Sequence, residues 1–236
     1  MSLPILNTPE YTAVVPSTKQ QVKFRPFLVK EEKILFMALQ GQDQKEMTNA
    51  VRNIIETCVI TDGFNVDKLA MFDIEYLFLQ LRGKSVGENV DLRLKHRDQS
   101  ECKNIIDVSV NLDNIHVEFP EDYSDKIMLT NDVGIQLQFP GVSHVGNFNV
   151  NTQDFDQLLD FISSCVICIY DNDNVYDTFS NAEIKQFLES LNQQQFQKIQ
   201  KFFTEAPKLT HDIEWTCDKC GKEETIHLEG LASFFT

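Results

Sequence analysis

Two cysteines near the C-terminus of the chain have the spacing of metal ligands. Cys217 and Cys220 are separated by two residues and followed directly by Gly221, within the run WTCDKCGKEETIHLEG. The flanking runs alternate polar and apolar residues, so the pair is expected in a turn between two strands. Such a turn typically supplies half of a tetrahedral zinc site, and its glycine permits the positive φ that directs backbone N–H groups toward the thiolates. A structural zinc ion needs two further ligands.

One source for the missing ligands is the run SSCVICIYD. We expect it to be helical, and residues three apart on a helix lie about 60° apart around the axis, so both of its sulfurs can face one ion. The predicted zinc ligands are therefore Cys165, Cys168, Cys217 and Cys220. Core packing is the competing interpretation for Cys165, because it shares an apolar stripe with Ile162 and Ile169 and cysteine is often buried as a small hydrophobe.

The run KHRDQSEC offers another source, with His96 six residues before Cys102. His211 and His227 flank the C-terminal turn on its two strands and form a third source. Four protein ligands would close the site, so a zinc ion bound there would be structural and not catalytic. The adjacent acidic residues, Glu223 and Glu224, are expected to be solvated.

The composition is that of a folded intracellular protein. The chain has 236 residues, of which 42% are hydrophobic and 18 are Phe, enough for the core of one large domain or two modest ones. No run of eighteen apolar residues and no signal-peptide pattern is present, so no membrane partner is expected. In a reducing cytosol, the six cysteines are expected to be thiols or metal ligands.

The charge distribution argues against nucleic acid as a partner. The formal net charge is −15, and residues 61–236 carry fourteen Lys and Arg against thirty Asp and Glu. Nucleic-acid-binding proteins normally present a basic patch or stripe, and an acidic surface repels phosphate. We interpret the acidic excess as a source of solubility.

Hydrophobic periodicity predicts an α+β fold, with helical N- and C-terminal parts around an antiparallel β-meander and a C-terminal zinc-ribbon-like hairpin. Ser180 with Glu183 forms an expected capping box, and Asn192 is an expected N-cap. The expected parts are an extended N-terminal arm (1–24) lying on another domain or subunit, an N-terminal helical part (25–83), an antiparallel β subdomain (84–150), a C-terminal helical part (151–207), and the CxxCG hairpin with an aromatic tail (208–236).

Sequence motifs give no support for an enzyme. The chain has no Gly-rich phosphate loop, no G-x-S-x-G and no H-E-x-x-H motif. The GKSVG at 83–87 lacks the first glycine and the spacer of a phosphate loop and is expected to be a turn. We therefore predict a protein without catalytic residues.

Several stretches, taken in order, resemble one family. They are VPSTKQQVKFRPFLVKEEKILFMAL, FDIEYLFLQLRGKSVG, CVICIYD, FLESLNQQQFQKIQKFFTEAPKL and CDKCGKEETIHLEGLASFF. Together they resemble the baseplate protein family of T-even-like contractile-tailed phages, which contains the central hub assembly proteins. The resemblance covers nearly the whole chain and is weakest at about 88–148. Of the cysteines, Cys165, Cys217 and Cys220 match the family pattern.

This resemblance implies a non-enzymatic role in building the baseplate hub, through contacts with other hub proteins. The expected location is the infected host cytoplasm during assembly, and the virion tail baseplate if the protein stays in the particle. The resemblance does not decide whether the protein forms a homo-oligomer. The alternative from a different class is a zinc-ribbon nucleic-acid-binding accessory factor, which needs a basic face near the cysteines. Lys219 and Lys222 are outnumbered there by six Asp and Glu residues.

Overall fold

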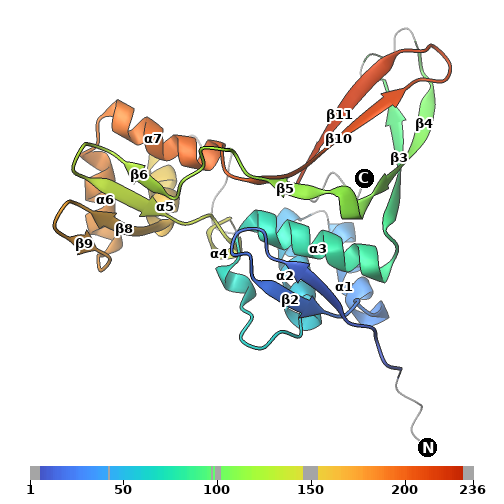
Figure 1. Cartoon of the computed structure of the whole chain (residues 1–236), viewed down its shortest axis with the longest axis horizontal. Helices are drawn as coiled ribbons and strands as arrows, with labels where there is room; N and C mark the ends of the chain where they lie inside the picture. Colours follow the sequence, from blue (N-terminus) through green and yellow to red (C-terminus); the bar gives the residue numbers. More distant parts are fainter. Residues whose placement is uncertain (1–5, 42, 97, 99–101, 146–153, 231–236) are drawn as a thin grey trace, which may run out of the picture. The chain divides into compact units, whose positions relative to one another are not determined.

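A computed structural model describes residues 6–41, 43–96, 98, 102–145 and 154–230, and it has an α+β fold (Figure 1). The helices are α1 (Val29–Gly41), α2 (Gln44–Cys58), α3 (Met71–Ser85), α4 (Val142–Val145), α5 (Phe155–Ser164), α6 (Asn181–Glu189) and α7 (Gln193–Thr204). The strands are β1 (Tyr11–Val14), β2 (Gln21–Phe24), β3 (Asn89–Lys95), β4 (Ile105–Asn111), β5 (His116–Glu118), β6 (Lys126–Met128), β7 (Gly134–Leu137), β8 (Val166–Tyr170), β9 (Val175–Tyr176), β10 (Lys208–Thr216) and β11 (Glu223–Glu229). Within these residues, no helix has both the length and the apolar character needed to cross a membrane.

The chain folds into two compact units. The first unit comprises Met1–Glu118 and Lys208–Thr236, and the second comprises Phe119–Pro207. The second is an insertion, because Glu118 at the end of β5 pairs with Lys208 at the start of β10 in antiparallel register. The strands expected in one β subdomain at 84–150 are therefore divided between the units. Hydrophobic alternation shows that a segment is a strand but not which strand it pairs with. The expected boundaries at 84 and 150 therefore differ from the boundaries of the two units.

The expected N-terminal arm is a β-hairpin that packs within the first unit. β1 pairs with β2, and Phe24 forms an isolated bridge with Val59 at the end of α2. The buried apolar residues of this segment are Ala13, Val15, Val22 and Phe24. In the hairpin turn, Ser17 donates from its backbone N–H (2.8 Å) and its hydroxyl (2.5 Å) to the two carboxylate oxygens of Asp73. Residues 1–5 of the expected arm, and the aromatic tail at 231–236, lie outside the described residues.

A partly buried ion pair lies at the start of α1. Glu31 is buried, accepts from the backbone N–H of Leu28 at 2.8 Å, and pairs with Arg25 at 3.0 Å. Burial favours the neutral form of Glu31, but these donors outweigh it, so the pKa of Glu31 lies below its usual value. This acidic residue of the KEEK run therefore fixes the entry of the chain into α1.

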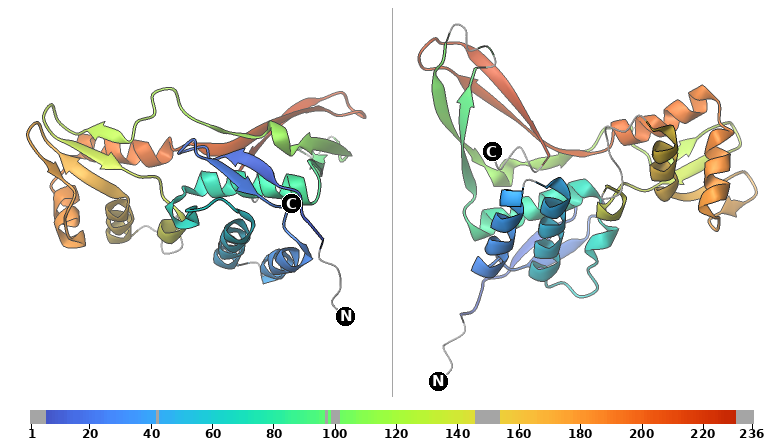
Figure 2. Two further views of the ribbon diagram at one scale, coloured as in Figure 1. Left: turned by 60° about the horizontal axis from the view of Figure 1, so that its bottom comes forward. Right: turned by 180° about the vertical axis from the view of Figure 1, so that it is seen from behind.

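Two antiparallel ribbons dominate the rest of the first unit. We call β3–β4 the first ribbon and β10–β11 the second ribbon, and Figure 2 shows them side by side. Their facing sides share one apolar core with Leu79 of α3. The ribbon residues of this core include Val90, Leu92, Leu94, Val110, Leu209, Ile213, Trp215 and Leu228. The loop of the first ribbon and the turn of the second ribbon are therefore brought to the same end.

The second unit is a four-stranded antiparallel sheet, in the order β6-β7-β8-β9, packed with α5, α6 and α7. The expected capping box of Ser180 with Glu183 and the expected N-cap at Asn192 are confirmed, and Asn192 also forms a capping box with Gln195. The helix expected through the SSCVICIYD run is wrong beyond Ser164, because Cys165 is its C-cap and Cys168 lies on β8. The β-branched residues of VICIY favour the strand that pairs with β7.

The contact between Ser17 and Asp73 gives a testable prediction. Replacing Ser17 with Ala removes the hydroxyl donor from a buried carboxylate, and we expect the free energy of unfolding to fall by about 1–3 kcal/mol. The matched control is Thr18→Ala, because the Thr18 side chain is exposed and its change should stay within about 0.5 kcal/mol. Urea unfolding of the three proteins measures the difference; equal midpoints for both variants would contradict the prediction.

Candidate metal centre

The turn of the second ribbon has the geometry of a metal-binding knuckle. The last pair of the ribbon is Thr216 with Glu223, and the turn between them is closed by the N–H of Cys217 donating to the carbonyl of Lys222 at 2.9 Å. Gly221 has φ of 71° and donates to the carbonyl of Cys217 at 2.8 Å. Only glycine adopts this backbone conformation without strain. The expected CxxCG hairpin is therefore confirmed as a local structure.

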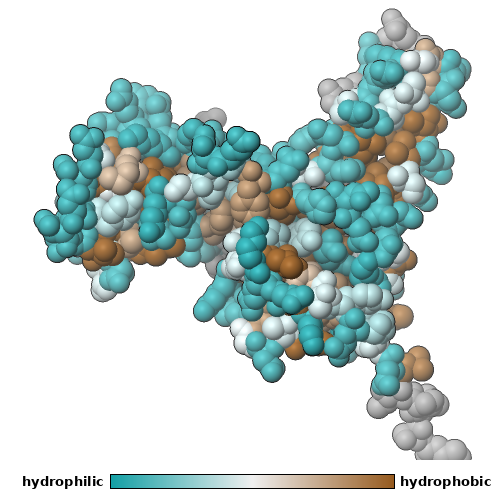
Figure 3. All heavy atoms as spheres, in the orientation of Figure 1, coloured by the Kyte–Doolittle hydropathy of each residue, from teal (hydrophilic) through white to brown (hydrophobic). Residues whose placement is uncertain are grey.

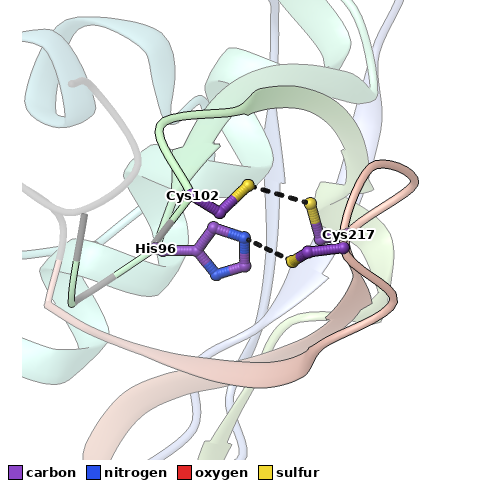
Figure 4. Close-up of side chains that lie close together, drawn as sticks. His96, Cys102 and Cys217 are labelled. Carbon is purple, nitrogen blue, oxygen red and sulfur yellow. Dashed lines mark hydrogen bonds between the residues drawn. The ribbon is translucent and has the colours of Figure 1, made fainter. Parts of the chain in front are cut away.

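The first ribbon brings a histidine and a third cysteine to the same place. His96 follows the last residue of β3, and Cys102 lies shortly before β4, so both belong to the loop that closes this ribbon. Figure 4 shows the side chains of His96, Cys102 and Cys217 directed toward one another. The ligand atoms of four residues lie within 4.8 Å of one another, namely His96, Cys102, Cys217 and Cys220.

Two of the separations between these atoms match those around a tetrahedral zinc ion. The sulfurs of Cys102 and Cys217 are 3.9 Å apart, and Nε2 of His96 is 3.4 Å from the sulfur of Cys220. With zinc–sulfur and zinc–nitrogen bonds of about 2.3 and 2.0 Å, a tetrahedron places two sulfurs about 3.8 Å apart and a nitrogen and a sulfur about 3.5 Å apart. Three sulfurs and one imidazole can thus hold a metal ion without large rearrangement.

Burial and coordination number favour a structural site. Cys102 and Cys217 are buried, His96 is 2% exposed, and Cys220 lies at the surface of the turn. Four protein ligands fill the tetrahedron, whereas a catalytic zinc site keeps one position for water or substrate. This arrangement can join two ribbons but offers no coordination position for a reaction.

The surroundings of Cys217 lower the pKa of its thiol, which favours the thiolate form that binds metal. Burial alone would raise the pKa of Cys217, but the backbone N–H of Cys220, the His96 side chain and the backbone N–H of Lys219 stabilise its thiolate and lower that pKa to about 6. Hydrogen bonds to Glu224 and Cys217 raise the pKa of His96 to about 9. In the metal-free chain, these shifts favour the thiolate of Cys217 and the protonated form of His96. A bound metal ion would replace the proton on His96, since only neutral imidazole is a ligand.

Neighbouring side chains support the cluster. The amide nitrogen of Asn104 lies 3.6 Å from the sulfur of Cys217 and donates to Asp218 at 2.5 Å, so it connects the loop to the turn. The ring of Trp215 lies 4.9 Å from the ring of His96, measured between centroids. These contacts restrict the motion of two candidate ligands.

The structure does not bring the other two cysteines predicted as ligands into this group. Cys165 and Cys168 belong to the second unit, on a helix end and a strand, so the helical geometry on which their assignment depended is absent. Burial raises the pKa of the Cys165 thiol to about 11. The sulfur of Cys168 lies 3.6 Å from the side-chain oxygen of Gln136.

His96 and Cys102 are the pair that the KHRDQSEC run offered as an alternative. In the sequence, these two residues lie between two runs that alternate polar and apolar residues. Cys217 and Cys220 lie between two runs of the same kind. His211 and His227 are not members of the group of four.

Comparison with known proteins identifies a family for this chain. The model of a family described as "T4 bacteriophage base plate protein" matches residues 8–236, which is nearly the whole chain. Neither the curated proteins nor the solved structures include a chain that matches.

Metal content distinguishes the two possible ligand sets. We expect Cys102→Ser and Cys217→Ser to lose the metal ion that the wild-type protein retains, because each removes one of four ligands. Cys168→Ser is the matched control and should keep its metal, since this cysteine lies in the second unit. Elemental analysis of the purified proteins measures the ratio of metal to chain. Metal loss in Cys168→Ser together with retention in Cys102→Ser would favour the four-thiolate set instead.

Proposed function

We propose, since this chain belongs to the T4 bacteriophage base plate protein family, that it takes part in building the central hub of the baseplate through protein–protein contacts. The family membership supports a structural role in the phage baseplate and a place in the virion tail. The proposal adds the hub as the site of action and other hub proteins as partners. The match over residues 8–236 is the observation that carries it.

The candidate site agrees with a structural role better than with catalysis. Its four ligand atoms come from protein, so it has no free coordination position. The family likewise suggests a protein that is not an enzyme. We propose that the protein contributes shape and binding surface to the baseplate.

The nucleic-acid alternative is disfavoured by the charges around the turn. Lys222, one of the two lysines of the turn, forms an ion pair with Glu224 at 3.1 Å, so its charge is neutralised. Hydrophilic residues cover most of the face shown in Figure 3, and the net charge of the chain is −15. A phosphate backbone would meet a largely acidic surface.

We further propose that the metal is zinc and that its role is to fasten the two ribbons. Three thiolates and one imidazole match the soft and borderline ligands that zinc prefers, whereas calcium and magnesium require oxygen ligands. Under this proposal, the ligands are His96, Cys102, Cys217 and Cys220, and Cys165 and Cys168 remain thiols of the second unit. When bound, the zinc ion supplies a cross-link between a loop and a turn that are distant in the sequence.

The hub assignment can be tested in infected cells. We expect an affinity-tagged copy of the protein to co-purify with other hub proteins, and disruption of its gene to abolish complete tails while genome replication continues. Electron microscopy of the mutant lysate and identification of the captured proteins provide the two measurements. Normal tails in the mutant would overturn the proposal; capture of nucleic acid in a salt-sensitive manner would support the alternative instead.

Removal of the metal tests the proposed role of zinc. After chelation, we expect faster amide hydrogen exchange in the site-proximal ends of β3, β4, β10 and β11, because the link between the ribbons is lost. Zinc binding contributes on the order of 10 kcal/mol in isolated zinc fingers, but a unit with its own apolar core should lose only local protection. The second unit serves as an internal control and should exchange at an unchanged rate. Equal exchange with and without chelator in both ribbons would contradict the role.

A further inference from the structure

A carboxylate occupies the inner face of the second ribbon, where alternation otherwise places apolar residues. Glu224, Ile226 and Leu228 share this face of β11, and the side chain of Glu224 is only 10% exposed. Glu224 is paired directly with Trp215 of β10, so the two side chains stand on the same side of the ribbon. A carboxylate largely removed from water is unfavourable unless it has hydrogen-bonding or charged partners.

Those partners connect Glu224 to the candidate metal centre. Its Oε1 atom lies 2.7 Å from Nδ1 of His96 and 3.1 Å from Nζ of Lys222. The other ring nitrogen of His96, Nε2, faces the sulfur of Cys220 at 3.4 Å. A neutral imidazole carries one proton, and a carboxylate that accepts from Nδ1–H leaves the Nε2 lone pair free to bind a metal ion.

We propose that Glu224 is a positioning residue of the metal centre, which holds the Nδ1–H tautomer of His96 and presents Nε2 to the ion. The inference rests on the proposed zinc site. Metal-ligating histidines commonly donate their second N–H to a carboxylate, which fixes the tautomer and raises the basicity of the ligand, and loss of such a partner typically lowers metal affinity 10–100-fold. Trp215 packs on the same ring and limits its rotation.

A second carboxylate–histidine pair on the same ribbon provides a matched control. Asp212 lies 2.5 Å from Nδ1 of His227, and both side chains are more than half exposed. His227 is not a member of the group of four potential ligands. Removing this pair changes one charge on the ribbon without touching the candidate site.

The experiment compares Glu224→Ala, Glu224→Gln and Asp212→Asn with the wild-type chain. Zinc affinity is measured by competition with a chromophoric chelator, and the tautomer of His96 is read from the ¹⁵N shifts of its ring in the zinc-bound protein. We expect Glu224→Ala to bind zinc 10–100-fold more weakly and to lose the single Nδ1–H tautomer. Glu224→Gln should recover part of the affinity, because its amide oxygen still accepts from Nδ1–H, and it keeps the shape of the side chain if the Ala variant fails to fold. Asp212→Asn should match the wild-type protein.

Two outcomes separate the failure of this inference from the failure of the zinc proposal. Wild-type zinc affinity and an unchanged His96 tautomer in both Glu224 variants would overturn the positioning role while the zinc site stands. A wild-type protein that binds no zinc would overturn the zinc site and this inference with it. Equal losses in Asp212→Asn and the Glu224 variants would show a general effect of charge and would also overturn the positioning role.

Discussion

The apolar inner faces of the two ribbons are buried against each other in one core. The arrangement of the first unit around these ribbons depends on this burial. A two-stranded ribbon is at best marginally stable in water, so neither β3–β4 nor β10–β11 would persist alone. At one end, Leu79 of α3 joins their shared core. At the other end the core reaches a loop and a turn, where Cys102 and Cys217 still belong to it. These two cysteines, with His96 and Cys220, form the cluster of potential ligands. A metal ion bound there would add a cross-link at the end of the apolar core.

This arrangement suits the structural role that the baseplate family indicates. A site closed by four protein ligands affects the shape and rigidity of the chain, and proteins of a large assembly act through the surfaces that they hold in place. Near the N-terminus, the ion pair of Arg25 with Glu31 and the contact of Ser17 with Asp73 likewise each fix a connection between elements.

The parts of the structure that depend on local interactions could be predicted from the sequence. Helical periodicity predicted the N-terminal helical part in which α1, α2 and α3 lie. The capping box at Ser180 and the N-cap at Asn192 predicted the starts of α6 and α7, because a cap involves residues at most three apart. The spacing of Cys217 and Cys220 similarly predicted the knuckle. The other members of the group, His96 and Cys102, lie more than a hundred residues away in the chain and are brought there by ribbon packing. The inward position of Glu224, expected to be solvated, follows from the register with β10, which spacing does not determine.

The junction between β5 and β10 has a broader consequence. These strands are adjacent and antiparallel, with Glu118 opposite Lys208, so they form a hairpin in which a complete folded unit stands where a tight turn would suffice. Chain ends that lie so close together permit the inserted part to fold on its own core and to differ in size or content without shifting the sheet that carries it. The first unit can therefore be regarded as a frame and the second as an inserted module, so that new recognition surfaces can be added to the module while the frame is left unchanged.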